Sequence, residues 1–170
     1  DPDANPLATP SGKLEIWSDT IAGFDYDDCP GHATWLEPVE WLGADLAKTY
    51  PLHLISNQPA SRLHSQLDDG IIAQEAKVAG REAVTLHPDD AAARNIKDGD
   101  VVRLFNDRGE CLAGAVISDG ISPGIVQLPT GAWYDPTRPG QTGSLDKHGN
   151  PNILTRDAGT SSLAQGPTAH

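Results

Sequence analysis

The sequence predicts a compact, mainly β domain built from short strands, as in a β-barrel. Its 170 residues are enough for one domain with a hydrophobic core. The 17 Gly and 14 Pro favour many turns over long helices. From residue 50 onward, short apolar runs alternate with turns that contain Gly, and this pattern is typical of barrels.

Four apolar segments are predicted to be strands: residues 52–55, 101–105, 110–117 and 125–128. In the second segment Val102 and Leu104 face one side and Arg103 faces the other. Residues 106–109 have the composition of a hairpin turn, so we expect Asp107 and Arg108 to serve only that turn.

One short helix is predicted to begin at Pro88. The fixed φ of proline suits a first helical turn, the two following Asp favour the positive end of the helix dipole, and three Ala propagate the helix. We expect His53 and His87 to be packing or capping residues rather than ligands.

The first 49 residues are predicted to form a wrapping segment that links to upstream domains, and residues 50–170 the barrel with an irregular tail. The chain begins at Asp1 rather than at Met, so we expect a piece of a longer polypeptide. Residues 13–17 alternate polar and apolar side chains, which predicts a half-buried strand. Three aromatic residues are expected to anchor the segment to the core or to another domain: Trp35, Trp41 and Tyr50.

Composition excludes several functions. The net charge of −12 argues against nucleic-acid binding, which depends on clustered Lys and Arg. No run approaches the roughly 18 apolar residues of a membrane-spanning helix. Cys29 and Cys111 form no C-x-x-C pair, so neither zinc nor thioredoxin chemistry is indicated. Two free thiols are expected, and a disulfide is the alternative.

The densest set of polar side chains follows the first predicted strand, in residues 56–67. Burying a polar group without a partner costs about 1–3 kcal/mol, so a core cannot hold this set. A polar loop leaving a strand is where a fold places ligand contacts. The candidate binding residues are Asn57, Gln58, Arg62, His64, Ser65 and Gln66. An ordinary solvated loop is the alternative, as is a structural ion pair for Arg62.

After Leu128 the apolar periodicity ends, and about forty residues are irregular and rich in Gly, Asn, Thr and Ser. Segments of this length without secondary structure are often functional. Trp133, Tyr134 and Leu154 argue that the tail is ordered. We therefore expect it to lie across a ligand or a neighbouring domain.

Three motifs in this order carry a resemblance: Arg62-Leu63-His64-Ser65-Gln66, then Gly131-Ala132-Trp133-Tyr134-Asp135-Pro136, then the tail from Asn152-Ile153-Leu154-Thr155 to Ala164-Gln165-Gly166. With them, nearly the whole chain resembles the C-terminal domain of the dimethyl sulfoxide reductase family of molybdenum enzymes. The likeness is greatest to the branch with biotin sulfoxide reductase and trimethylamine N-oxide reductase. At Asn57-Gln58 the chain departs from the Pro-His pair of the oxide-reducing branch.

The resemblance implies a double-psi β-barrel (aspartate decarboxylase-like), with a few short helices and long ordered loops, that covers a molybdopterin guanine dinucleotide. In that family, two such cofactors hold one molybdenum, which removes an oxygen atom from an S-oxide or N-oxide. A serine from another domain completes the coordination. The resemblance therefore assigns no catalytic residue and no metal ligand to this chain, which we expect to be inactive in isolation.

The resemblance also adds Asn152 and Gln165 to the six candidate binding residues. Side-chain amides offer both donors and acceptors, which match the edges of pterin and guanine. Ser65, His64 and Arg62 suit a pyrophosphate. The chain has no Gly-rich P-loop, so a nucleotide would not be held by that commoner cradle.

The function implied is a domain of a molybdenum oxidoreductase that reduces S-oxides or N-oxides. Its partners are the remaining domains of the same polypeptide and a small oxide, without nucleic acid or membrane. We expect a cytoplasmic protein, with the periplasm as alternative. Two other functions stay open. One is a stand-alone double-psi barrel that binds a protein without redox chemistry; the other is a self-processing decarboxylase using Ser144 or Ser161, each close after a Gly.

Overall fold

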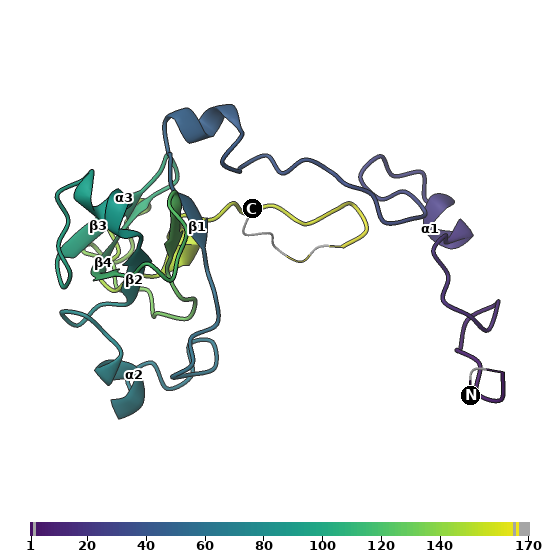
Figure 1. Ribbon diagram of the computed structural model, residues 1–170, viewed down its shortest axis with the longest axis horizontal. Coiled ribbons are helices and arrows are strands. Elements are labelled where there is room, and N and C mark those ends of the chain that lie inside the picture. Colours follow the sequence, from purple (N-terminus) through teal and green to yellow (C-terminus); the bar gives the residue numbers. More distant parts are fainter. Residues whose placement is uncertain (2, 165, 167–170) are drawn as a thin grey trace. The chain divides into compact units, whose positions relative to one another are not determined.

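The computed structural model describes residues 1, 3–164 and 166, and these residues form two compact units. The larger unit is Val39–Arg156, and the smaller comprises Asp1–Pro38 with the described residues after Arg156. Every strand of the described residues lies in the larger unit, whereas the smaller unit has helix α1 (Asp19–Ala22) (Figure 1). The predicted division at residue 50 stays a prediction.

The strands form one mixed sheet in the order β1-β5-β2-β4-β3. Their bounds are β1 (His53–Ile55), β2 (Ala83–Leu86), β3 (Val101–Phe105), β4 (Glu110–Ile117) and β5 (Ile125–Gln127). Strand β1 pairs parallel to β5 and β2 parallel to β4, while β2 with β5 and β3 with β4 pair antiparallel. The predicted mainly β fold is confirmed, and each of the four predicted strands is found to within one residue.

Short helical segments complete the larger unit: η1 (Asp45–Lys48), α2 (Ile71–Glu75), α3 (Pro88–Ala92) and η2 (Pro151–Ile153). Helix α3 confirms the predicted helix, with Pro88 in its first turn. Nδ1 of His87 accepts the N–H of Asp89 at 3.1 Å, which confirms its capping role. Among the described residues, no helix has the length and apolar character needed to cross a bilayer.

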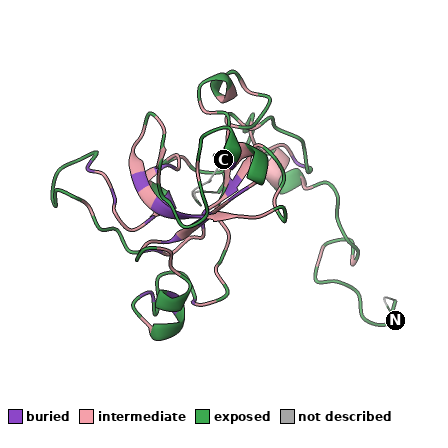
Figure 2. Cartoon of the chain, turned by 60° about the vertical axis from the view of Figure 1, so that its left-hand side comes forward, coloured by how far each residue is buried: buried purple, intermediate pink, exposed green. Residues whose placement is uncertain are grey.

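The core is centred on β4, where Cys111, Ala113 and Ala115 are fully buried (Figure 2). Gly114 in the same strand admits no side chain, because a Cβ there would lie 2.3 Å from the Cβ of Val78. Burial, with the nearby carboxylate of Asp146, raises the pKa of the Cys111 thiol to about 12. Both cysteines are free, as predicted.

The turn between β3 and β4 does more than the sequence predicts. Oδ1 of Asn106 accepts the N–H of Arg108 at 3.0 Å, as expected of a turn residue. The Arg108 guanidinium also donates to both carboxylate oxygens of Glu40, at 2.7 and 2.9 Å, and to the carbonyl of Leu154 at 2.6 Å. The prediction that Arg108 serves only the turn is therefore wrong, because its long side chain ties two distant segments to the hairpin.

The strand predicted over residues 13–17 is also wrong. In the described chain these residues form no strand, and Leu14 and Ile16 are 81% and 83% exposed. Alternation makes a strand only where another strand pairs with it, and no strand lies among the described residues of this unit. Tyr50 does anchor its segment, since its ring packs edge-on against that of Phe105, with the two ring centroids 6.4 Å apart.

Candidate functional site

The larger unit contains two hollows of different chemistry. The first, which we call the apolar cavity, has a volume of about 380 Å³ and is lined mainly by apolar residues of 41–54 and of the sheet. The second, which we call the polar cleft, has a volume of about 490 Å³. The residues lining the polar cleft are His64, Ser65, Thr130, Gly131, Ala132, Trp133, Tyr134, Asn150 and Asn152.

The parallel pair β1 and β5 brings the polar loop and the tail to one place. Past the ends of these strands, the carbonyl of Ile55 accepts the N–H of Leu128 at 3.0 Å, and the carbonyl of Asn57 accepts that of Thr130 at 2.9 Å. Two segments far apart in sequence therefore leave the sheet side by side. We call residues 64–66 the loop wall of the cleft and residues 130–134 the tail wall.

The two walls touch at the level of the backbone. Gly131 has a φ of +95°, and a Cβ there would lie 1.9 Å from the carbonyl oxygen of His64. The Trp133 indole N–H donates to the carbonyl of Ser65 at 2.8 Å. Only glycine permits this approach, so the tail wall is fitted to the loop wall.

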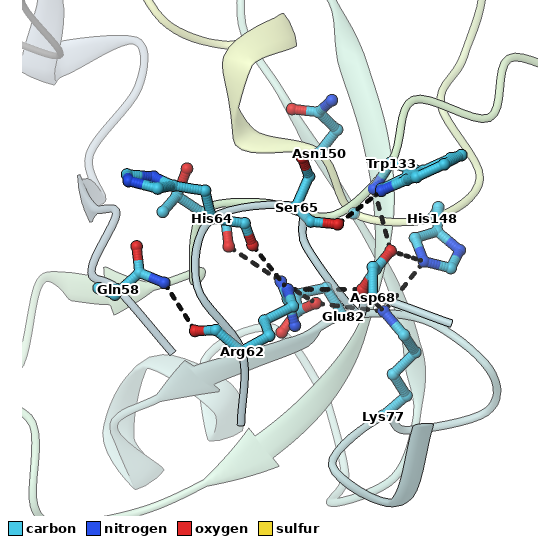
Figure 3. A network of polar contacts seen from close by, with 12 residues as sticks. Gln58, Arg62, His64, Ser65, Asp68, Lys77, Glu82, Trp133, His148 and Asn150 are labelled. Carbon is cyan, nitrogen blue, oxygen red and sulfur yellow. Dashed lines mark hydrogen bonds and ion pairs between the residues drawn. The ribbon is translucent and has the colours of Figure 1, made fainter. Parts of the chain in front are cut away.

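Two cations and two carboxylates, which we call the charge network, lie beside the walls (Figure 3). Arg62 Nη2 is 2.8 Å from Glu82 Oε2, and Lys77 Nζ is 2.7 Å from Asp68 Oδ1. Lys77 Nζ also lies 3.4 Å from Glu82 Oε2. All four side chains are at most 5% exposed, so the charges neutralise one another away from water.

The charge network holds both walls through hydrogen bonds. Arg62 donates from Nε to the carbonyl of His64 at 3.1 Å and from Nη2 to that of Thr130 at 2.9 Å. Asp68 Oδ2 accepts the backbone N–H of Trp133 at 3.1 Å. Burial by itself raises the pKa of Asp68, but hydrogen bonds from Lys77 and Trp133 and the charges of Lys77 and Arg62 hold that pKa below its ordinary value.

His148 lies at the edge of the charge network. Its Nε2 is 2.9 Å from Lys77 Nζ and 3.0 Å from Asp68 Oδ2. Its carbonyl accepts the N–H of Glu82 at 2.9 Å. The segment that carries His148 is thus fastened to the charge network by both side chain and backbone.

A buried carboxylate, Asp146, shapes the remaining side of the cleft. It accepts the backbone N–H groups of Asp135, Gly149 and Asn150 at 2.7, 2.8 and 2.8 Å. The Asn150 side chain in turn caps η2 by accepting the N–H of Asn152 at 3.0 Å. These bonds place Asn150 and Asn152 at the cleft.

The structure brings three of the eight predicted site residues together in the polar cleft: His64, Ser65 and Asn152. Gln66 follows them in the loop wall and is exposed. Gln165 lies outside the described residues.

The remaining three predicted residues precede the cleft or lie behind it. Gln58 is exposed and donates from Nε2 to the carbonyl of Arg62 at 2.8 Å. Asn57 is half-buried, and its Nδ2 donates to the carbonyl of Gln58 at 3.2 Å. Arg62 is buried in the charge network, so the ion pair that the sequence left open is present. A cofactor contact for each of these residues stays a prediction.

The other members of the charge network were not predicted from the sequence. Asp68, Lys77 and Glu82 follow no local motif, and Asp68 stands in a stretch, Asp68-Asp69-Gly70, that looks like an ordinary turn. Asp68 accepts the N–H of Trp133, 65 positions away, and Glu82 bonds Arg62, 20 positions away. No spacing in the chain encodes such contacts.

Neither candidate serine has the surroundings of an activated nucleophile. Ser144 is fully buried, and its hydroxyl is bonded to Thr137 Oγ1 and to the N–H of Arg138. The Ser161 hydroxyl accepts the N–H of Ala164 at 3.0 Å. In the described chain neither is bonded to an imidazole or carboxylate, so the decarboxylase alternative has no base. The described residues also hold no group of three or more His, Cys, Asp or Glu suited to a metal ion.

The chain belongs to the family of molybdopterin dinucleotide-binding domains: the family model "Molydopterin dinucleotide binding domain" matches residues 52–170. It is the molybdopterin-binding domain of the dimethyl sulfoxide reductase family, as its motifs predicted. Trimethylamine-N-oxide reductase 1 of Escherichia coli O157:H7 is 54% identical over 100% of the chain. The dimethyl sulfoxide/trimethylamine N-oxide reductase of Cereibacter sphaeroides is 54% identical over 98%.

The chain spans 20% of the length of these two relatives. Among solved structures, the acetylene hydratase from Pelobacter acetylenicus matches with a TM-score of 0.69 and 24% identity, over 90% of this chain and 21% of that one. This likeness shows a shared fold. The alternative of a stand-alone interaction module gains no support, because the relatives above are reductases that contain this segment as one part.

The polar cleft fits a molybdopterin dinucleotide in the chemistry of its donors and acceptors. Amides, hydroxyls and an imidazole line it. Beside it, within the described part of the chain, Nη1 of Arg62 and Oδ1 of Asn57 are buried without a hydrogen-bond partner. Because buried polar atoms are nearly always paired, this donor and this acceptor, which lie behind the cleft, are left free for a polar partner.

Proposed function

We propose that the chain is the C-terminal cofactor-binding domain of a molybdenum oxidoreductase that reduces S-oxides or N-oxides by oxygen-atom transfer. The observation that carries this proposal is the polar cleft, which is built from the same loop and tail that carry the family motifs. Reductases of trimethylamine N-oxide and dimethyl sulfoxide, by their names, are 54% identical to it. The substrate and the metal ligand then belong to the remaining four fifths of the polypeptide.

The cofactor proposed is bis-molybdopterin guanine dinucleotide. When bound, it supplies a molybdenum centre that exchanges an oxygen atom and two electrons with the substrate. The role of this chain is to bind and orient it: amides of the cleft meet pterin or guanine edges, while Ser65 and His64 meet phosphate oxygens. The residues proposed to contact it are Asn57, Gln58, Arg62, His64, Ser65, Gln66, Asn152 and Gln165.

The fold proposed in detail is a double-psi β-barrel. Support comes from the curled sheet (Figure 2). The sheet is mixed: β1 with β5 and β2 with β4 are parallel pairs of strands that are not consecutive in the chain, so the chain crosses over between them.

The partner proposed is the rest of the same polypeptide. Next to the loop wall, four apolar side chains are exposed: Leu63 at 57%, Leu67 at 76%, Ile71 at 77% and Ile72 at 64%. Exposed apolar side chains that follow closely along one stretch of chain suit burial by a neighbouring domain. The cytoplasmic location expected from the sequence stays a prediction, which cell fractionation would test.

The test of the proposed function is the metal and nucleotide content of the full-length protein. Acid hydrolysis should release two GMP for each molybdenum, and metal analysis separates molybdenum from tungsten. A protein with neither metal nor GMP would overturn the proposal.

A substitution tests the cleft residues. Gln66→Leu in the full-length protein should lower molybdenum and GMP per chain, since an exposed amide contributes little to the fold but is proposed to bind the cofactor. Gln141→Leu is the matched control, because Gln141 is also exposed and does not line the cleft. Equal cofactor content in both variants would remove Gln66 from the site.

A further inference from the structure

Three residues of the charge network hold the cleft from behind without lining it. Asp68, Lys77 and Glu82 are absent from the lining of the polar cleft, yet each lies within one or two contacts of a wall. Asp68 bonds the N–H of Trp133 in the tail wall. Glu82 bonds the same Nη2 of Arg62 that donates to Thr130. The spacing of the walls therefore depends on residues that a ligand in the cleft does not reach.

Lys77 links the two carboxylates of the charge network. Its ammonium lies 2.7 Å from Asp68 Oδ1 and 3.4 Å from Glu82 Oε2, with a side chain 1% exposed. Without the charge of Lys77, Arg62 would be the one remaining cation of the charge network, facing two carboxylates. An unbalanced buried charge is strongly unfavourable, so the guanidinium or a carboxylate would have to move.

Such a movement would reach the cleft directly. The guanidinium of Arg62 donates hydrogen bonds to the carbonyls of both His64 and Thr130, one in each wall. Its Nη1, the nitrogen left unpaired in the described chain, is oriented by the bonds that Nε and Nη2 make. A shift of the guanidinium therefore changes both the spacing of the walls and the direction of the unused donor.

We propose that Asp68, Lys77 and Glu82 are positioning residues for the molybdopterin dinucleotide, acting through Arg62 and the two walls that the charge network joins. This inference rests on the proposed function and deepens it. The three residues contact no part of the cofactor. The charges of these three residues set the positions of the groups that contact the cofactor.

The experiment compares three forms of the full-length protein: the wild type, Lys77→Met, and the double variant Asp68→Asn with Lys77→Met. Lys77→Met leaves one buried negative charge in excess, so cofactor release should be about 10- to 100-fold faster, the range found when outer residues of a metal site are changed. The double variant restores charge balance, and the amide oxygen it introduces at position 68 can still accept the N–H of Trp133. It should recover most of the wild-type retention.

A second readout separates positioning from general destabilisation. Melting temperatures are measured with and without cofactor, because the stabilisation by a ligand grows with its affinity. In Lys77→Met the difference between the two temperatures should shrink. Glu40→Gln is the control, since it breaks the Arg108 ion pair at the apolar cavity. In Glu40→Gln, the melting temperatures with and without cofactor should fall by the same amount, and the molybdenum content should stay unchanged.

The outcomes are distinguishable. A wild type without molybdenum or GMP overturns the proposed function, and the inference with it. The inference alone is overturned if the wild type holds the cofactor and Lys77→Met releases it at the wild-type rate, with the same difference between its two melting temperatures as the wild type. If Lys77→Met does not fold, the double variant decides: a folded protein that keeps the cofactor supports the role of charge balance, and one that loses it overturns that role.

Discussion

Two arginines of the larger unit each tie together segments that are distant in sequence, but their surroundings differ. The Arg62 side chain is fully buried beside the polar cleft, with Asp68 and Glu82 as counter-charges. The Arg108 side chain is 28% exposed at the apolar cavity, with Glu40 as its main partner. Hydrogen bonds to the Glu40 carboxylate raise the pKa of Arg108.

The difference shows when an ion pair can serve a site and when it serves only the fold. Breaking a buried ion pair leaves an uncompensated buried charge, so displacing a member of a buried network is strongly unfavourable. A partly exposed pair is screened by water and contributes modestly. Arg62 can therefore position a cleft, whereas Arg108 fastens residue 40 and the tail to a hairpin.

The largest effect is expected for Arg62→Met. It leaves the carboxylates of Asp68 and Glu82 with Lys77 as the one remaining cation of the charge network, so the free energy of unfolding should fall by about 3–5 kcal/mol. Denaturant unfolding measures this loss, and metal analysis should show that cofactor content falls with it. A loss of about 2 kcal/mol or less would place Arg62 in the same class as a partly exposed pair such as that of Arg108.

The next effect is expected at the contact between the walls. Gly131→Ala should cost about 1–3 kcal/mol and reduce cofactor retention, because the new Cβ meets the carbonyl of His64. Gly140→Ala is the control: its φ is +76° and its Cβ would have nothing within 4 Å. Equal losses of retention in the two variants would mean that backbone strain, not the clash, is responsible.

A smaller effect is expected for Arg108→Met. The lost bonds to Glu40 and Leu154 are partly exposed, so the expected destabilisation is about 1–2 kcal/mol. Molybdenum content should match that of the wild type. A fall in cofactor content as large as that of Arg62→Met would end the distinction between the two arginines.

The last prediction concerns the loss of stability at low pH. The pKa of Asp68 is lowered in the folded protein, so its carboxylate stabilises the fold above its ordinary pKa of 3.8, and this stabilisation is lost as pH falls through the lower folded value. In Asp68→Asn that part of the pH dependence should disappear. Unfolding free energies measured on both sides of pH 3.8 would test it, and an unchanged acid profile would contradict it.

The sequence by itself determined the strands β1, β3, β4 and β5, the helix α3, the hairpin and the family. These features depend on neighbours: alternation in residues 101–105, Pro88 ahead of two Asp, and motif order along the chain. It also located the polar loop, because so many polar groups cannot enter a core. His64 and Ser65 were predicted in this way, and Asn152 was predicted from the family resemblance; all three line the cleft.

Only the tertiary structure decided which charges meet. The partners of Arg62 and Arg108 lie 20 and 68 positions away. Residues 13–17 have a strand pattern, but the described part of their unit offers no strand to pair with. Periodicity reports what a segment can bury. The pairing of strands and of buried charges is set by packing of distant parts of the chain, which no local pattern records.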